Sequence, residues 1–308
     1  TVELSKTDIT TGKELPGAHL RVIDGNANLI DEWVSEEKPH IIQKLVVGRE
    51  YELIETIPAD GYATAESVAF KVENTGEVQK VKMEDDVTKV YLSKSDITDG
   101  KPVIGAKLSI IDEAGKVVET WTTTEEEHYI EKLPIGKYTL REETAPAGYL
   151  VAEDVLFTVK DTGVEQKVEM KDDYTKVEVT KSDITDGKPV IGAKLTIFDK
   201  DGKEVESWVT EEKPHYIEKL PGGEYTLREV TAPDGYEVAE DVKFTVAETG
   251  EIQTVVMKDA PKKQPETTPK TGDDRNPLIW LLLLGIGGCM AGAAWYLRKK
   301  DEKDQNQD

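Results

Sequence analysis

Cysteine is almost absent from this chain of 308 residues. The single one, Cys289, lies in an apolar run near the C-terminus, so no disulfide can cross-link the remainder. Basic residues are also scarce, with 39 Lys and Arg against 62 Asp and Glu and a net charge of −23. Because such a surface repels polyanions, nucleic acid is not expected as a partner. Any covalent cross-link must use chemistry other than a disulfide.

A secretory leader is not visible, because strand-like sequence starts directly at Thr1, and we therefore expect the chain to be a fragment. One long apolar run is present at residues 278–297, which is long enough for a helix that crosses about 30 Å of hydrocarbon. The basic residues 298–300 follow it directly. This order predicts a transmembrane helix, a cytoplasmic tail at 298–308 and an extracellular location for everything before residue 278.

Three copies of one pattern precede this run. LSKTDIT at residues 4–10 returns as LSKSDIT at 92–98 and VTKSDIT at 179–185, with a period of about 87 residues. Other landmarks return in the same order: Trp33, Trp121 and Trp208; His40, His128 and His215; Tyr51, Tyr138 and Tyr225; Tyr62, Tyr149 and Tyr236. A period close to the size of a domain predicts separate tandem domains rather than a solenoid that shares one core.

Short runs that alternate apolar and polar residues lie between turn signals in each copy, as in residues 242–246 before Thr249 and Gly250. This is typical of half-buried antiparallel strands, and it predicts an all-β sandwich for each copy. The junctions at 86–89 and 173–176 contain no Gly or Pro, so we expect a semi-rigid stalk. After residue 259 the chain becomes Pro-rich, which indicates an extended linker.

Some charged residues occupy positions that this alternation assigns to the apolar face. Lys6, for example, shares its face of the first predicted strand with Val2 and Leu4. A glutamate and an aspartate of each copy are placed in the same way in later strands. The full set is Lys6, Lys94 and Lys181; Glu55, Glu142 and Glu229; and Asp85, Asp172 and Asp259.

Three inward charges per copy are costly unless they meet, because an unpaired buried charge costs several kcal/mol. Burial disfavours the charged forms and favours a neutral amine beside a protonated carboxyl, which are the reactants of an amide bond. The glutamate could take a proton from the amine and return one to the departing water. We therefore predict a Lys–Asp isopeptide bond. A hydrogen-bonded charge cluster that never reacts remains an alternative on these grounds.

Three motifs give the copies a resemblance to a known family. They are a first-strand K-x-D at Lys6, Lys94 and Lys181, a following G-A, and the boxes YTLREETAPAGY at 138–149 and YTLREVTAPDGY at 225–236. With these motifs residues 1–259 resemble the CnaB-type or SpaA-like prealbumin-fold modules of Gram-positive adhesins and pilins. The resemblance implies Ig-like sandwich domains at 1–86, 87–173 and 174–260. It also implies that each lysine joins the last-strand aspartate, with the boxed glutamate as catalyst.

Two departures from the family pattern stand out. All three acceptors are Asp, where many family members have Asn, so water rather than ammonia would leave. The first copy reads YELIETIPADGY, with Pro58 one place earlier than Pro146 and Pro233.

The C-terminal region resembles the signal that sortases read. Residues 268–272, which are Thr268, Pro269, Lys270, Thr271 and Gly272, precede a polar spacer, the apolar run and the basic end. The family motif is LPxTG, and Thr268 stands where Leu is usual. The resemblance implies cleavage between Thr271 and Gly272 and transfer to a cell-envelope amine, with 261–277 as wall-spanning linker. A permanent single-pass anchor is the alternative.

Other functions have less support. Each copy has one histidine at the repeated position and no second imidazole or cysteine at ligand spacing, so no metal or cofactor is expected. No nucleophile and base for an external substrate is visible, so we expect no enzyme beyond single-turnover bond formation. The predicted function is a structural stalk in a Gram-positive cell wall, with sortase and peptidoglycan or its precursor as partners. Alternatives are a sortase-polymerised pilus subunit, or an adhesin whose modules, or a region before Thr1, bind host matrix.

Overall fold

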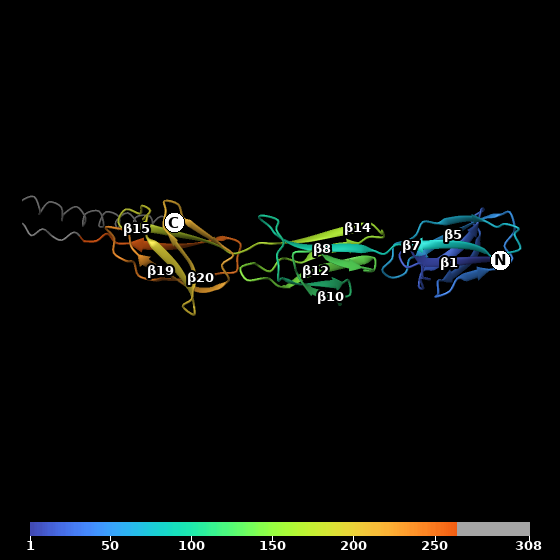
Figure 1. The fold of residues 1–308 in the computed structure, drawn as a ribbon, viewed down its shortest axis with the longest axis horizontal. Coiled ribbons are helices and arrows are strands. Elements are labelled where there is room, and N and C mark those ends of the chain that lie inside the picture. Colours follow the sequence, from blue (N-terminus) through green and yellow to red (C-terminus); the bar gives the residue numbers. More distant parts are fainter. Residues whose placement is uncertain (264–308) are drawn as a thin grey trace, which may run out of the picture. The chain divides into compact units, whose positions relative to one another are not determined.

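The computed structural model describes residues 1–263, and every regular element in them is a β-strand (Figure 1). The strands form three modules of seven, and the predicted all-β class is confirmed. Module 1 contains β1 (Val2–Asp8), β2 (His19–Asp24), β3 (Leu29–Val34), β4 (His40–Ile42), β5 (Glu50–Ile57), β6 (Val68–Lys71) and β7 (Gln79–Asp85).

Modules 2 and 3 repeat this order of strands. Module 2 contains β8 (Lys89–Asp96), β9 (Lys107–Asp112), β10 (Val117–Thr122), β11 (His128–Glu131), β12 (Gly136–Thr144), β13 (Val155–Val159) and β14 (Glu165–Asp172). Module 3 contains β15 (Lys176–Asp183), β16 (Lys194–Asp199), β17 (Glu204–Val209), β18 (His215–Glu218), β19 (Gly223–Thr231), β20 (Val242–Val246) and β21 (Ile252–Asp259).

Each module pairs a three-stranded sheet with a four-stranded sheet. In module 1 the sheet orders are β4-β1-β7 and β3-β2-β5-β6, and the other modules repeat them. The predicted antiparallel pairing holds everywhere except between the first and last strands, which run parallel, as β1 and β7 do. Alternation along a strand reports only its buried face, so it could not reveal this pairing. As a result, the chain enters each module at one end of this strand pair and leaves at the other.

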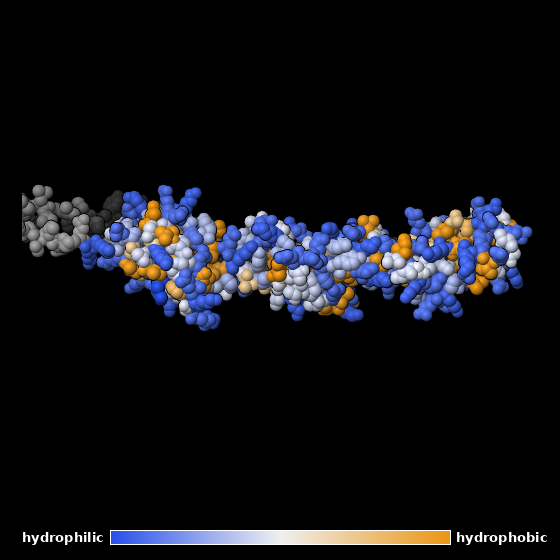
Figure 2. Space-filling model, in the orientation of Figure 1, coloured by the Kyte–Doolittle hydropathy of each residue, from blue (hydrophilic) through white to orange (hydrophobic). Residues whose placement is uncertain are grey.

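The core of each module lies between its two sheets. In module 1, Val2 and Leu4 of β1 pack against Leu20 and Leu53 of the opposite sheet, and all four are at most 2% exposed. Burying one such side chain stabilises the fold by about 1.5–3 kcal/mol. The outer surface is predominantly hydrophilic on the face drawn in Figure 2, with apolar residues scattered between charged ones. The two sheet faces therefore follow the alternation of the sequence.

Candidate functional site

A buried lysine, glutamate and aspartate meet in the core of every module. In module 1 the Lys6 side chain is 1% exposed, its Nζ contacts Asp85 Oδ1, and it lies 2.8 Å from Glu55 Oε1. The same contacts recur between Lys94, Glu142 and Asp172 and between Lys181, Glu229 and Asp259, with lysine-to-glutamate distances of 3.1 Å in both. All nine residues that the sequence placed on the inner faces are therefore brought together, three per module.

Strand register explains why these side chains meet. Lys6 on β1 is paired with Met83 on the parallel strand β7, so Asp85 lies two residues further along and on the same face. Glu55 comes from β5 in the opposite sheet, where it is paired with Leu20. The cluster thus joins the first strand of a module to its last strand, with the glutamate reaching across the core.

A backbone amide fixes each glutamate. Glu55 Oε2 accepts a hydrogen bond of 2.6 Å from the N–H of Ala65, and Glu142 and Glu229 accept equivalent bonds from Ala152 and Ala239. The donor lies ten residues after the glutamate in every copy. Sequence reasoning missed this contact, because a backbone donor leaves no mark in the identity of its residue.

Burial raises the pKa of each aspartate in the cluster. The pKa of Asp85 is raised to about 7 and that of Asp172 to about 6, and the pKa of Asp259 is also raised. The adjacent lysine opposes this effect, while the charge and hydrogen bonding of the glutamate add to it. The carboxyls of Asp85 and Asp172 are therefore partly protonated near neutral pH.

Two carboxyl oxygens of each cluster have no hydrogen-bond partner among the described residues. In module 1 they are Asp85 Oδ2 and Glu55 Oε1, and the latter lies 2.8 Å from Lys6 Nζ as an ion pair. The equivalent atoms are unpaired in the other modules. Since buried polar atoms rarely stay unpaired, a proton on the aspartate directed at the glutamate would satisfy both oxygens. The geometry therefore suits a neutral aspartic acid beside a glutamate base.

Family models match all three modules. Residues 1–87, 88–174 and 175–261 each match the SpaA prealbumin-like fold domain. The chain belongs to the SpaA prealbumin-like family. The family resemblance seen in the sequence motifs is thereby confirmed, and the Lys–Glu–Asp cluster is a feature of all three SpaA modules of this chain.

Solved structures with similar modules come from several bacteria. The chain is similar to the Bacillus anthracis TIE protein, with 29% identity and a TM-score of 0.46 over 84% of this chain and 50% of that one. It thus spans about half of that protein. It is also similar to the shaft pilin SpaA of Lactobacillus rhamnosus GG, with 17% identity and a TM-score of 0.32 over 58% of this chain and 99% of that one. A streptococcal ancillary pilin has 17% identity and a TM-score of 0.32 over 85% and 99% of the two chains. None of the curated proteins compared with the chain matches it.

The aspartate of the K-x-D motif has a role of its own in these SpaA modules. Asp8 accepts hydrogen bonds from the Tyr62 hydroxyl at 2.7 Å and from the turn amides of Thr10 and Thr11. Burial alone would raise the pKa of Asp8, but these hydrogen bonds outweigh it and lower the pKa to about 2. Asp96 with Tyr149 and Asp183 with Tyr236 repeat the pair. We call each pair, with the glycine before its tyrosine, the module's socket.

The repeated histidines pack on the repeated tryptophans. His40 stacks on Trp33 with ring centroids 4.1 Å apart, and His128 and His215 stack in the same way on Trp121 and Trp208. Each histidine also lies within 3 Å of one carboxylate. Within residues 1–263 no group of three or more His, Cys, Asp and Glu is arranged to hold a metal ion.

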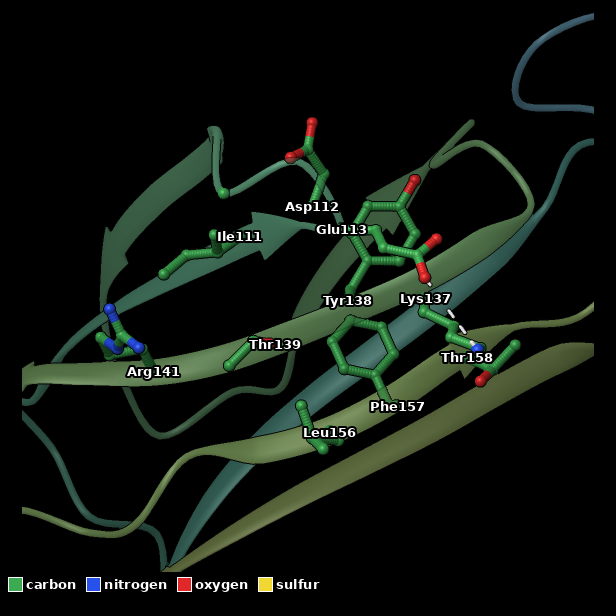
Figure 3. A pocket seen from close by; sticks show the side chains of 11 residues that line it. Ile111, Asp112, Glu113, Lys137, Tyr138, Thr139, Arg141, Leu156, Phe157 and Thr158 are labelled. Carbon is green, nitrogen blue, oxygen red and sulfur yellow. Dashed lines mark ion pairs between the residues drawn. The ribbon is translucent and has the colours of Figure 1, made fainter.

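A surface hollow of about 540 Å³ lies on the four-stranded sheet of module 2 (Figure 3), and no residue of the cluster lines it. Its wall includes Tyr138, Phe157 and Leu156, which is 81% exposed. At the position of Leu156, module 1 has Ala69 and module 3 has Lys243. The hollow therefore depends on a residue of one module only and contributes nothing to the repeated cluster.

The predicted sortase motif at 268–272 and the apolar run at 278–297 lie outside the described residues. Within residues 1–263 the structure contains no helix that is long and apolar enough to cross a membrane.

Proposed function

We propose that the chain is a structural stalk of a cell-wall-anchored surface protein, in which an isopeptide bond between lysine and aspartate locks each module. The observation that supports this most strongly is the buried Lys–Glu–Asp cluster, which recurs in all three modules and always links the first strand to the last. Stability alone does not explain a buried charge cluster, because apolar residues of similar volume stabilise a core equally well or better.

The proposed reaction uses only groups of the cluster. Lys6 Nζ, as a neutral amine, attacks Cγ of the protonated Asp85 carboxyl. Glu55 accepts a proton from the attacking nitrogen and returns a proton to the departing hydroxyl. One N–C bond forms, one C–O bond breaks and one water leaves. Burial and strand register hold the amine and the carboxyl in contact. The entropy cost of bringing two reactants together is therefore already met by folding.

Intact mass of residues 1–262 tests the proposal. We expect a mass lower than the unmodified composition by three water molecules, one per module. Glu142→Gln should restore one water, because an amide cannot accept the proton of the amine. Glu143→Gln is the matched control, since Glu143 lies next in β12 and is exposed. An unmodified mass for the unsubstituted chain, with linear tryptic peptides around Lys94, would contradict the proposal.

Attachment to the wall rests on the sequence of the C-terminal signal. We propose that sortase cleaves between Thr271 and Gly272 and joins Thr271 to peptidoglycan or its precursor. In cells that make the full chain, Thr271→Ala should move the protein from the wall fraction to the membrane fraction. Persistence in the wall fraction would rule this out. A ladder of high-mass polymers from the unsubstituted chain would instead indicate a pilus subunit.

A further inference from the structure

A lysine directly after β18 of module 3 binds the socket of module 2. Lys219 Nζ lies 2.8 Å from Asp96 Oδ2 and 4.8 Å from the centre of the Tyr149 ring. Burial would lower the pKa of Lys219, but its hydrogen bonds with Asp96 and Tyr149 outweigh this and raise the pKa. A Cβ on Gly148 would lie 2.1 Å from the carbonyl oxygen of Lys219, so only glycine allows the two backbones to approach this closely.

The junction between modules 1 and 2 repeats this arrangement. Lys132 Nζ lies 3.4 Å from Asp8 Oδ2 and 4.8 Å from the centre of the Tyr62 ring. A Cβ on Gly61 would lie 2.5 Å from the carbonyl oxygen of Lys132. The next residue, Leu133, is only 2% exposed. Both junctions therefore use one docking element, a lysine inserted into the socket of the preceding module, while the leucine after it packs in the core of its own module.

Module 1 carries the same element at its own leading end. The sequence QKL at 43–45 corresponds to EKL at 131–133 and 218–220. Lys44 has a φ of 65°, against 64° for Lys132 and 62° for Lys219, a left-handed conformation that few non-glycine residues adopt. Yet Lys44 is exposed and makes no ion pair within residues 1–263, and Leu45 is only half-buried. The apolar Val46 and Val47 beside it are 57% and 54% exposed.

We propose that Lys44 and the backbone around it form a docking surface for a further SpaA module that precedes Thr1. That module would present an Asp–Tyr–Gly socket to Lys44, as modules 1 and 2 do to Lys132 and Lys219. Charge complementarity between an exposed lysine and a buried carboxylate, and the identical backbone conformation, specify this occupant. The proposal does not depend on isopeptide formation, because no cluster residue takes part in the junction.

Lysine reactivity in an extended chain tests this docking. To make the extended chain, residues 88–175 are fused directly before Thr1 of the chain 1–262. This fusion keeps the natural number of residues between modules, because Val2 of module 1 corresponds to Val177 of module 3. Both chains are acetylated with a limiting amount of an N-hydroxysuccinimide ester, and each lysine is quantified by peptide mass spectrometry. We expect the reactivity of Lys44 to fall several-fold in the extended chain, to the level of Lys219. The exposed Lys13 should not change.

Asp96→Asn in the added copy is the matched variant, and it should return Lys44 to its original reactivity. An unchanged Lys44 beside a protected Lys219 would overturn the proposal. So would a Lys219 as reactive as Lys13, because the junction contact would then be absent from solution. Lys44 could also be protected in the chain 1–262, to an extent that grows with the concentration of that chain. This result would show that the surface binds the free end of a second copy, and it would overturn the proposal of a preceding module.

Discussion

Replacing Glu142 with Gln should lower the melting temperature of module 2 by on the order of 20 °C. Without a base the proposed bond between Lys94 and Asp172 should not form, and these residues are 78 positions apart. By the entropy model for cross-links, closing a loop of this length restricts the unfolded chain by about 4.5 kcal/mol. Differential scanning calorimetry of residues 1–262 should show one transition moving down while the transitions of the other modules stay in place.

The control for this experiment is again Glu143→Gln. It makes the same chemical change one residue further along β12, on the exposed face, where substitutions usually alter stability by less than about 0.5 kcal/mol. Equal melting temperatures for the two variants, with mass confirming that Glu142→Gln has lost the bond, would contradict a stabilising cross-link.

The pH dependence of the two forms should also differ. In the unlinked module, burial raises the pKa of Asp172, to about 6 when Glu142 is present, above the unfolded value of about 3.9. The folded state then binds the proton more tightly than the unfolded state, so the stability that this proton provides is lost as pH rises through the folded pKa. In the linked module Asp172 no longer titrates. The difference in melting temperature between wild type and Glu142→Gln should therefore widen from about pH 4 to pH 7.

The cluster could be predicted from the sequence because β-strand geometry is regular. Alternation places Lys6 with Val2 and Leu4, and the same rule turns Glu55 and Asp85 inward, so three separate strands each indicate a buried charge. The three-fold repeat then shows that these placements belong together. Module fold and site composition follow from such local periodicity.

Contacts that depend on the backbone or on neighbouring modules were beyond sequence reasoning. The amide of Ala65 positions Glu55, but any residue except proline could supply that donor. Asp8 was visible only as part of a motif, and its partner Lys132 is 124 residues away in the next module. The parallel pairing of β1 and β7 is equally invisible, because alternation assigns a face and not a partner strand.

Under a stretching force, the locked modules should not extend. The chain enters module 2 along β8, and force would pass from Lys94 through the amide to Asp172 at the end of the parallel strand β14. The residues between these two carry no load as long as the bond holds. In the Glu142→Gln variant only hydrogen bonds and packing oppose the force, and unfolding should release about 260 Å of chain.

Single-molecule force spectroscopy on residues 1–262 can resolve this difference. The unsubstituted chain and Glu143→Gln should show no release of module length, and Glu142→Gln should show one. The double variant with Glu142→Gln and Glu229→Gln should show two such releases, because each proposed bond would lock only its own module. A full-length release from the unsubstituted chain would mean that β8 and β14 are not covalently joined. The parallel pairing makes the test sensitive, because both ends of each module are loaded along the two strands that the proposed bond would connect.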